Sequence, residues 1–225
     1  LLIDGTNFGP LGNAFSPSAV YGPSASGYTA TSCSVAIAHT RMSCVTAEGA
    51  GAGHTWKVTV GGQESDESVA TTSYDKGTIN FFGLSALATT GGETINMVGL
   101  NFGPVGTTVT ATYGPDGDYT RYTAASCTVL SDNIGMSCDS VEGVGGPHKW
   151  VLTVAGQESD ASLGSTSYKV PSISNVQKAN VVPPTLSTAG GEEFVISGND
   201  FGPTGSTHVD AVIYGGISAT GCSVQ

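Results

Sequence analysis

An internal repeat of about 94 residues constrains this chain more than any other feature. The segment Asn7-Phe8-Gly9-Pro10 returns as Asn101-Phe102-Gly103-Pro104 and again as Asp200-Phe201-Gly202-Pro203. A unit of this length is a complete small domain, because solenoid repeats span only roughly 20 to 50 residues. A shift of 94 residues also relates six pairs further along the chain: Cys33 and Cys127, Cys44 and Cys138, His54 and His148, Trp56 and Trp150, Gln63 and Gln157, and Tyr74 and Tyr168.

Three tandem domains follow from this repeat. We expect residues 1–75 to form a copy that lacks its first strand, residues 76–169 a complete copy, and residues 170–225 the first part of a third. Both ends fall in strand-like runs, so we expect the sequence to be a window on a longer protein. The shift grows to 99 residues between Phe102 and Phe201, which places an insertion near residues 181–187. The junctions at 74–79 and 168–173 are not Gly/Ser linkers, and this predicts domains joined stiffly end to end.

Short strands separated by turns are predicted within each copy. Apolar and polar residues alternate over 94–98, 109–113 and 150–154, and Gly- and Pro-rich turns separate these runs. Alternation is typical of strands with one buried face, and many short strands in one small domain favour a two-sheet β-sandwich. The expected core of the complete copy comprises Ile95, Met97, Val109, Ala111, Tyr113, Cys127, Val129, Cys138, Trp150, Leu152 and Val154.

The charge of the chain excludes several classes of partner. Only 7 Lys and Arg stand against 18 Asp and Glu among 225 residues, a formal net charge of -11. Binding to nucleic acid needs a basic surface, and so does binding to an anionic membrane, so neither partner is expected. No run of 18 apolar residues is present, which argues against a transmembrane helix in this segment.

The cysteines predict the compartment. Cys33 and Cys44 are 11 residues apart, and so are Cys127 and Cys138, a spacing that suits a disulfide between neighbouring strands. The alternative is zinc, which normally takes four ligands, whereas each copy offers two Cys and one His. We expect the partner of Cys222 to lie beyond residue 225. Disulfides predict an oxidising location, outside the cell or at its surface.

Candidate chemistry is sparse. His54 and His148 each precede a Trp by two residues, so we expect them in the core beside it rather than as metal ligands or bases. Asp116-Gly117-Asp118 is interpreted as a hairpin turn and not as a calcium loop. The segments Glu64-Ser65-Asp66 and Glu158-Ser159-Asp160 are interpreted as turns that guard an edge strand, with binding of a cation or a subunit as the alternative. We therefore expect no catalytic residue, no metal, no cofactor and no enzymatic activity.

Glycans are a further expectation. The chain has no Asn-x-Ser/Thr sequon, and only 11% of its residues are charged. O-linked sugar on exposed turns would supply solubility, although Ser and Thr also simply suit β-rich surfaces. The candidate positions are Ser16, Ser18, Thr71, Thr72, Thr89, Thr90, Thr107, Thr108, Ser165, Thr166, Ser206 and Thr207.

The repeated motif also carries a family resemblance. Gly91-Gly92-Glu93 followed by residues 97–104, and Gly190-Gly191-Glu192 followed by residues 196–203, resemble the IPT/TIG family of immunoglobulin-like domains. That family occurs in plexins, growth-factor-type receptors, Rel-type transcription factors and extracellular repeat proteins. The half of each copy around Cys127, Cys138 and Trp150 is similar to tandem copies in large protist and fibrocystin-like surface proteins, and the composition is similar to that of glycosylated extracellular fibrils. The resemblance implies an all-β fold of tandem immunoglobulin-like sandwiches joined end to end.

Three functions are compatible with these patterns. The first is a structural segment of a long extracellular stalk or fibre, with further copies of itself in a linear array or filament and covalent O-glycans as its partners. The alternative is the ectodomain of a receptor or adhesin that binds a protein or a carbohydrate, for which the longer loop at residues 116–122 is the best place. The third is an accessory domain of a secreted carbohydrate enzyme.

Overall fold

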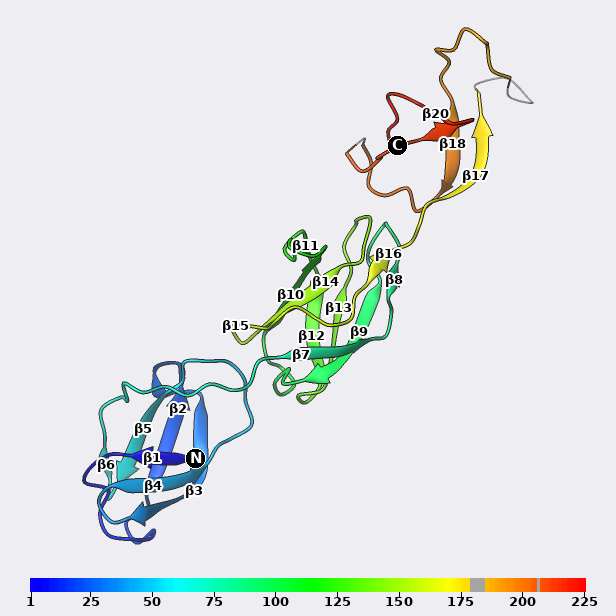
Figure 1. Ribbon diagram of the computed structural model, residues 1–225. Coiled ribbons are helices and arrows are strands. Elements are labelled where there is room, and N and C mark those ends of the chain that lie inside the picture. Colours follow the sequence, from blue (N-terminus) through cyan, green and yellow to red (C-terminus); the bar gives the residue numbers. More distant parts are fainter. Residues whose placement is uncertain (179–184, 206) are drawn as a thin grey trace.

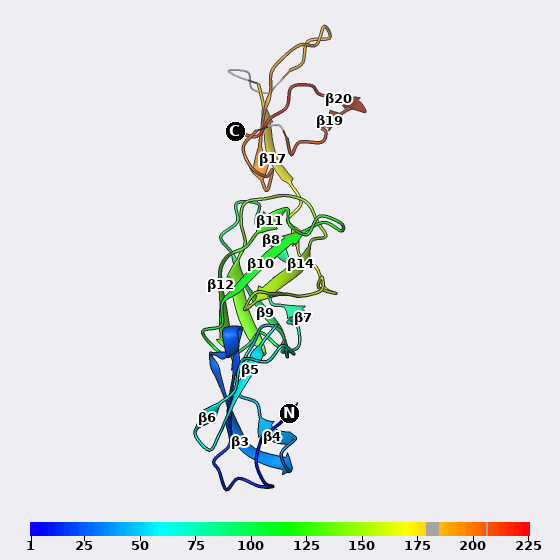
Figure 2. The ribbon, with the colours of Figure 1, turned by 90° about the vertical axis from the view of Figure 1, so that its left-hand side faces the viewer.

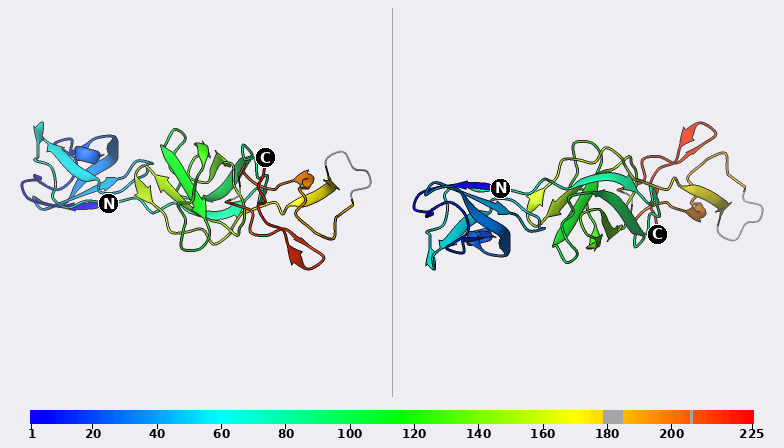
Figure 3. Two further views of the ribbon diagram at one scale, coloured as in Figure 1. Left: turned by 90° about the horizontal axis from the view of Figure 1, so that it is seen from above. Right: turned by 90° about the horizontal axis from the view of Figure 1, so that it is seen from below.

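The chain is an all-β array of domains. The computed structural model describes residues 1–178, 185–205 and 207–225, so most of the expected insertion lies outside the described residues. Strands dominate, with one 3-10 turn at Pro23–Ala25, and three domains follow one another along one axis (Figure 1). They stay in line when the molecule is turned (Figure 2 and Figure 3). Within the described ranges, no helix has the length and hydropathy that crossing a membrane requires.

The second domain is a sandwich of two four-stranded sheets. One sheet has the strand order β12-β13-β9-β7, the other has the order β11-β10-β14-β15, and the short strands β16 and β8 pair in parallel. This is the immunoglobulin-like fold class expected from the sequence. The strands are β7 (Thr78–Phe82), β8 (Ala86–Leu87), β9 (Thr94–Leu100), β10 (Val109–Gly114), β11 (Tyr122–Thr123), β12 (Ala125–Ser131), β13 (Gly135–Asp139), β14 (Lys149–Val154), β15 (Gln157–Glu158) and β16 (Ser167–Tyr168).

The first domain repeats this arrangement with one continuous strand where the second has two. Strand β3 pairs with β2 through its first residues and with β4 through its last, so the sheet order is β1-β4-β3-β2-β5-β6. The counterparts in the second domain, β11 and β12, are separated at Ala124. The strands are β1 (Leu2–Asp4), β2 (Ser18–Gly22), β3 (Tyr28–Ile37), β4 (Arg41–Val45), β5 (Thr55–Val60) and β6 (Gln63–Glu64).

The third domain contains two separate strand pairs. Strand β17 (Ser172–Gln177) pairs with β18 (Val195–Asn199), and β19 (Ile213–Tyr214) pairs with β20 (Ile217–Ser218). Strand β17 is exposed along its whole length, because the described residues of this domain include no second sheet that covers it.

Separate hydrophobic cores fill the first two domains. In the second domain, every expected core residue is buried except Cys127, which is half-buried and packs against the cluster. Phe102 plugs the same core from the repeated Phe-Gly-Pro turn, and it is fully buried. Ile79, Phe82, Leu87, Met136 and Tyr168 also belong to this core and were not expected there.

The repeated turn has the backbone that its residue types permit. Asn101 has φ 61° and Gly103 φ 79°, and both therefore lie in the left-handed region that Asn and Gly tolerate best. The first and third domains adopt the same conformation, with φ 65° at Asn7 and 60° at Asp200. Two backbone hydrogen bonds, Phe102 N–H to Asn133 O and Asn133 N–H to Gly103 O, hold this turn against the β12–β13 hairpin.

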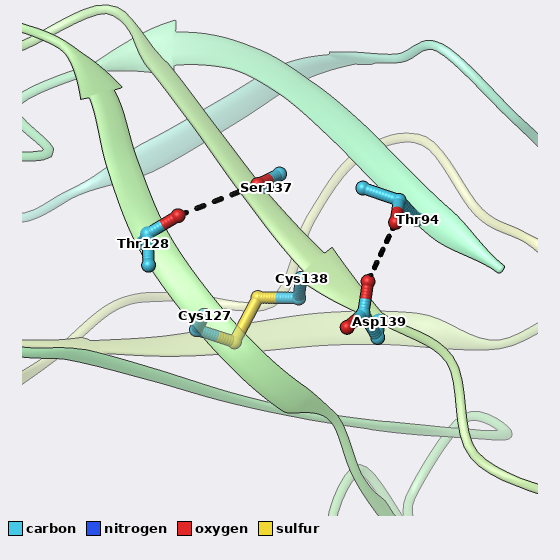
Figure 4. The surroundings of a disulfide bond; sticks show 6 residues. All are labelled: Thr94, Cys127, Thr128, Ser137, Cys138 and Asp139. Atoms are coloured by element: carbon cyan, nitrogen blue, oxygen red, sulfur yellow. Dashed lines mark hydrogen bonds between the residues drawn. A yellow bond between two sulfur atoms is a disulfide. The ribbon is translucent and has the colours of Figure 1, made fainter. Parts of the chain in front are cut away.

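Each of the first two domains contains one disulfide between adjacent strands. Cys127 on β12 joins Cys138 on β13, and Cys33 joins Cys44, with Cα atoms 4.1 and 4.2 Å apart. The strand register shifts next to the first cysteine of each pair. The disulfide therefore links a bulged strand covalently to its neighbour where the hydrogen-bond ladder is interrupted. Cross-strand hydrogen bonds, Thr94 to Asp139 at 2.7 Å and Thr128 to Ser137 at 3.5 Å, flank the bridge (Figure 4).

Serine side chains supply hydrogen-bond partners to backbone N–H groups of β14 that no neighbouring strand pairs. Trp150 N–H donates to Ser162 Oγ at 3.0 Å, and Leu152 N–H donates to Ser159 Oγ at 2.9 Å. The backbone N–H groups of the same serines donate back to the carbonyls of Trp150 and Leu152. Ser65 and Ser68 do the same for β5. The repeated Glu-Ser-Asp turn therefore removes free donors and acceptors from a strand edge, as interpreted from the sequence.

We predict that replacing Cys127 and Cys138 by alanine lowers the free energy of unfolding of the second domain by about 3 kcal/mol, because the bridge closes an 11-residue separation in the unfolded chain. Urea unfolding followed by tryptophan fluorescence measures this change. Cys222→Ala is the control and should leave the transition in place. An unchanged midpoint in the double variant would contradict the prediction.

Candidate functional site

An aromatic cluster lies at the end of each domain that faces the next one. In the second domain Tyr113 stacks on Trp150 with ring centroids 4.2 Å apart, and the edge of His148 contacts Tyr113, Tyr122 and Tyr168. Tyr113, His148 and Trp150 are at most 1% exposed. The first domain contains the same cluster, made of Tyr21, Tyr28, His54, Trp56 and Tyr74.

Two tyrosine hydroxyls form a closed set of hydrogen bonds with one loop residue. Val141 N–H donates to the Tyr113 hydroxyl, which lies 2.7 Å from the Tyr168 hydroxyl, and Tyr168 donates to Val141 O at 2.6 Å. Every polar group in this set has a partner, so the loop backbone is satisfied without a neighbouring strand. Ala47, Tyr21 and Tyr74 form the same set in the first domain.

A third tyrosine holds the tip of the same loop. Tyr122 accepts from Val144 N–H at 3.2 Å and donates to Val144 O at 3.1 Å. Tyr28 does this for Ala50 at 3.1 and 3.0 Å. A Cβ on Gly143 would meet the rings of Tyr122 and Tyr168 at under 3 Å, so the loop can approach the rings this closely only because that residue is glycine.

The hydroxyls of Tyr74 and Tyr168 stay protonated. Burial, followed by the hydrogen bond with Tyr21, raises the pKa of Tyr74 well above its ordinary value. Burial and the hydrogen bond with Tyr113 raise the pKa of Tyr168 in the same way. Each hydroxyl therefore remains a donor at any physiological pH, and the loops it holds keep one conformation.

The tip of this loop enters the next domain. Ala50 is 5% exposed and belongs to the hydrophobic core of the second domain, although it comes from the first. It faces Gly103 of the repeated turn, where a Cβ would lie 2.9 Å from the Ala50 side chain. At the next joint Val144 faces Gly202 in the same way. At both joints the glycine of the repeated turn, Gly103 or Gly202, receives a side chain from the preceding domain, and we call this glycine the socket.

Polar contacts surround the socket at the first joint. Asn133 Nδ2 donates to Glu48 Oε1 at 2.6 Å, and Gln157 Nε2 donates to Tyr74 O at 3.1 Å. Lys76, in the junction itself, pairs with Asp160 at 3.3 Å. At the second joint Thr89 N–H lies 3.4 Å from Asp200 Oδ1.

The two histidines are buried in the core, as interpreted from the sequence. His148 Nε2 lies 3.1 Å from Val144 O, to which the neutral ring donates. Both ring nitrogens of His54 and the Nδ1 of His148 have no hydrogen-bond partner among the described residues. No group of three or more His, Cys, Asp or Glu side chains with metal-binding geometry occurs in the described part of the chain.

The other sequence-predicted residues lie apart from the joints. Asp118 N–H donates to Pro115 O, so Asp116-Gly117-Asp118 is a turn between β10 and β11. Glu64 pairs with Lys57 at 2.9 Å. Cys222 is half-buried and forms no disulfide within the described residues.

Two of the expected glycan positions are wrong. Thr166 is 1% exposed and its hydroxyl accepts from Trp150 Nε1 at 2.9 Å, and Thr89 is 5% exposed, so neither can carry a sugar in the folded domain. Thr72, half-buried, accepts from Trp56 in the same way. Ser206 lies outside the described residues. The remaining positions are exposed or half-buried: Ser16, Ser18, Thr71, Thr90, Thr107, Thr108, Ser165 and Thr207.

Sequence reasoning missed the joint residues. The signal was present, because Tyr28 and Tyr122 are also 94 residues apart, and Glu48-Gly49-Ala50-Gly51 returns as Glu142-Gly143-Val144-Gly145. Repetition alone does not reveal that a buried residue of one domain contacts the turn of the next.

Comparison with known proteins gives limited similarity. No protein family and no curated protein matches the chain. Two structures of the Plexin A4 full extracellular region each share 16% identity over 75% and 78% of this chain, with a TM-score of 0.36. The Escherichia coli adhesin FdeC shares 17% identity over 80% of it, with a TM-score of 0.34. The chain spans 16% and 15% of the two plexin chains and 61% of the adhesin chain.

We predict that the folded chain loses stability in mild acid through His148. Burial, with a smaller contribution from nearby Arg121, lowers the pKa of His148 below its ordinary value. The unfolded chain therefore binds more protons, so the free energy of unfolding is highest above about pH 6.5 and falls as the pH drops toward the lowered pKa. Thermal unfolding between about pH 7.5 and 5 measures this.

The matched variant is His148→Gln, which keeps a donor for Val144 but does not titrate. Its unfolding temperature should depend less steeply on pH than that of the wild type, whereas His208→Gln, at an exposed position, should leave the dependence unchanged. Equal slopes for wild type and His148→Gln would contradict the assignment.

Proposed function

We propose that this chain is a segment of a long extracellular stalk or fibre, in which tandem immunoglobulin-like domains act as rigid units. The observation that carries this proposal is that the same joint occurs twice. A loop held by tyrosines places Ala50 against Gly103, and 94 residues later Val144 lies against Gly202. A joint built into every domain suits a linear array, because each added copy extends the same axis.

The junction between the first two domains is short and packed. Gly77 is buried, and a Cβ there would lie 3.1 Å from the Val154 side chain of the second domain. Asn101 Nδ2 donates to Lys76 O at 3.2 Å, so the junction backbone is hydrogen-bonded to the domain that follows it. These contacts restrict bending, whereas a solvated linker of the same length would allow the domains to swing.

Two further features support an extracellular location and a mechanical role. Both disulfides suit an oxidising compartment. Exposed Ser and Thr at the remaining candidate positions would accept O-linked sugar, and further copies of the chain would serve as the partners along the axis. A repeated scaffold needs no catalytic groups, and we propose that this segment is not an enzyme.

A substitution that separates the first two domains at their joint tests the proposed stalk. Ala50→Glu places a charged side chain against Gly103, where no space is available, so the two domains should separate while each keeps its fold. Small-angle X-ray scattering should show an elongated wild-type particle with about 40 Å per domain, and a broader distribution of lengths for the variant.

Ala52→Glu is the control, because Ala52 lies in the same loop but is exposed. It should scatter like the wild type. A wild type that is already flexible, or an Ala50→Glu variant as rigid as the wild type, would remove the physical basis of the stalk.

A receptor or adhesin ectodomain is the second candidate function, and one local difference between domains favours it. Thr112, Tyr119, Val151 and Glu158 line a crevice beside the loop at residues 116–122. In the first domain the position of Val151 is taken by Lys57, which pairs with Glu64. The second domain thus leaves Glu158 facing an open crevice with an aromatic rim.

Shortening the loop tests this candidate. Deleting Asp116 and Gly117 gives the second domain a loop of the length found in the first. If the crevice binds a partner, the native chain should capture that protein or glycan on a surface array and the shortened chain should lose it. Equal capture by both chains would contradict a receptor role for this loop.

A further inference from the structure

One face of the second domain carries a cluster of large apolar side chains that water can reach. We call it the outer patch, and it lies on the outer face of the β12-β13-β9-β7 sheet. Each of its side chains exposes at least half of its surface: Phe81 61%, Val98 52%, Leu100 52%, Leu130 57% and Ile134 50%.

Strand register places these side chains together. Val98 on β9 pairs with Phe81 on β7 on one side and with Gly135 on β13 on the other. Leu100 is the next outward residue of β9, and Ile134 immediately precedes Gly135, with its carbonyl accepting from Gly99 N–H. Leu130 lies at the bulge of β12 beside the same hairpin. Phe81, Val98 and Leu100 therefore share the outer face of the sheet, and Leu130 and Ile134 are exposed at the β12–β13 hairpin beside them.

The outer patch is large for an unpartnered face. Half-exposed side chains of this size present roughly 100 Å² each, so together they present roughly 500 Å², near the upper end of what a soluble monomer exposes. It contains no charged residue. The other end of the same face is polar, with the Thr94–Asp139 and Thr128–Ser137 contacts (Figure 4).

The fold does not require apolar residues at these positions. In the first domain, 94 residues earlier, Asp4 stands for Val98 and pairs with Arg41 at 2.5 Å. The positions equivalent to Leu100, Leu130 and Ile134 are occupied in the first domain by Thr6, Ala36 and Thr40. In the third domain the pair equivalent to Phe81 and Val98 is Asn175 and Ser197. At the position of Val98 an apolar residue occurs in one domain of three, so the sandwich does not require one there.

We propose that the outer patch is a docking surface for a second copy of this chain, with two second domains facing each other about a two-fold axis. Two such patches would bury roughly 1,000 Å² of apolar surface, and the polar rim brings the total above the lower bound of a specific interface. A two-fold pairing brings each surface against itself.

The charge distribution confines contact between two copies to uncharged areas such as this patch. Each chain carries a net charge of -11, so two copies repel each other over most of their surface. The outer patch is an uncharged area where they can meet without opposed carboxylates. A basic partner would find no carboxylate there to bind.

The patch also continues a surface that already joins domains. Leu100 precedes Asn101, and Ile134 follows Asn133, and both asparagines bond to the first domain or to the junction before the second. Pairing at this level would link two arrays next to a rigid joint. This inference goes beyond the proposed stalk and rests on the patch alone.

Sedimentation equilibrium of the chain from about 1 µM to about 500 µM tests the pairing. We expect a monomer–dimer equilibrium that strengthens as salt is raised, because salt screens the repulsion between acidic copies. The variant Val98→Asp/Leu100→Thr introduces the residues of the first domain and should weaken dimerisation at least about tenfold. Circular dichroism should show an unchanged fold.

Two further variants complete the test, one within the patch and one outside it. Phe81→Asn, which introduces the residue of the third domain, should weaken dimerisation if the double variant does not fold. Leu163→Ser is the control, because Leu163 is 92% exposed but lies outside the patch, and it should leave the equilibrium unchanged. A chain that stays monomeric throughout, or patch variants that dimerise like the wild type, would overturn the proposal. So would a monomeric chain that binds lipid vesicles or an apolar peptide through the patch.

Discussion

The hydrogen bonds between tyrosine hydroxyls and one loop are the interaction on which the rest of the structure depends. A loop at the end of a sandwich has backbone groups that no strand can satisfy, and leaving them buried without partners would cost about 1 to 3 kcal/mol each. Tyr113, Tyr122 and Tyr168 supply those partners from within the core and fix the loop in place. Because the loop is fixed by hydrogen bonds to the core, it presents Val144 to the next domain in one defined position.

The fold could be predicted from the sequence because its determinants are local and repeated. Alternation in β9, β10 and β14 identifies the buried face, and the 11-residue spacing of cysteines fits neighbouring strands. The joints could not be predicted, because Ala50 has no chemistry of its own and its burial arises only when the next domain is present. Thr89 and Thr166 failed as glycan positions for a related reason: residue type and turn composition do not reveal that a Thr is buried, as both are, or that Thr166 accepts from the Trp150 indole.

Packing contributes more than charge to the contact between the first two domains. Lys76 and Asp160 are 52% and 91% exposed, and an ion pair as exposed as this contributes little free energy. The glycine at position 103 contributes more to specificity, because any side chain there would displace Ala50. Close packing permits few arrangements, and in the proposed array it would limit the angle between domains.

The features that the domains share and the features that differ between them therefore indicate separate roles. The aromatic cluster, the tyrosine-held loop and the glycine socket recur at both joints, as features must if every copy is to be joined to the next in the same way. The outer patch does not recur, although the pairing of β9 with β13 recurs in the first domain as the pairing of β1 with β4. A shared fold cannot explain a surface that only one copy has, because the other copies fold with Asp4 and Ser197 at the same register position. What the domains share fits the proposed array, and what distinguishes the second domain fits the proposed lateral contact.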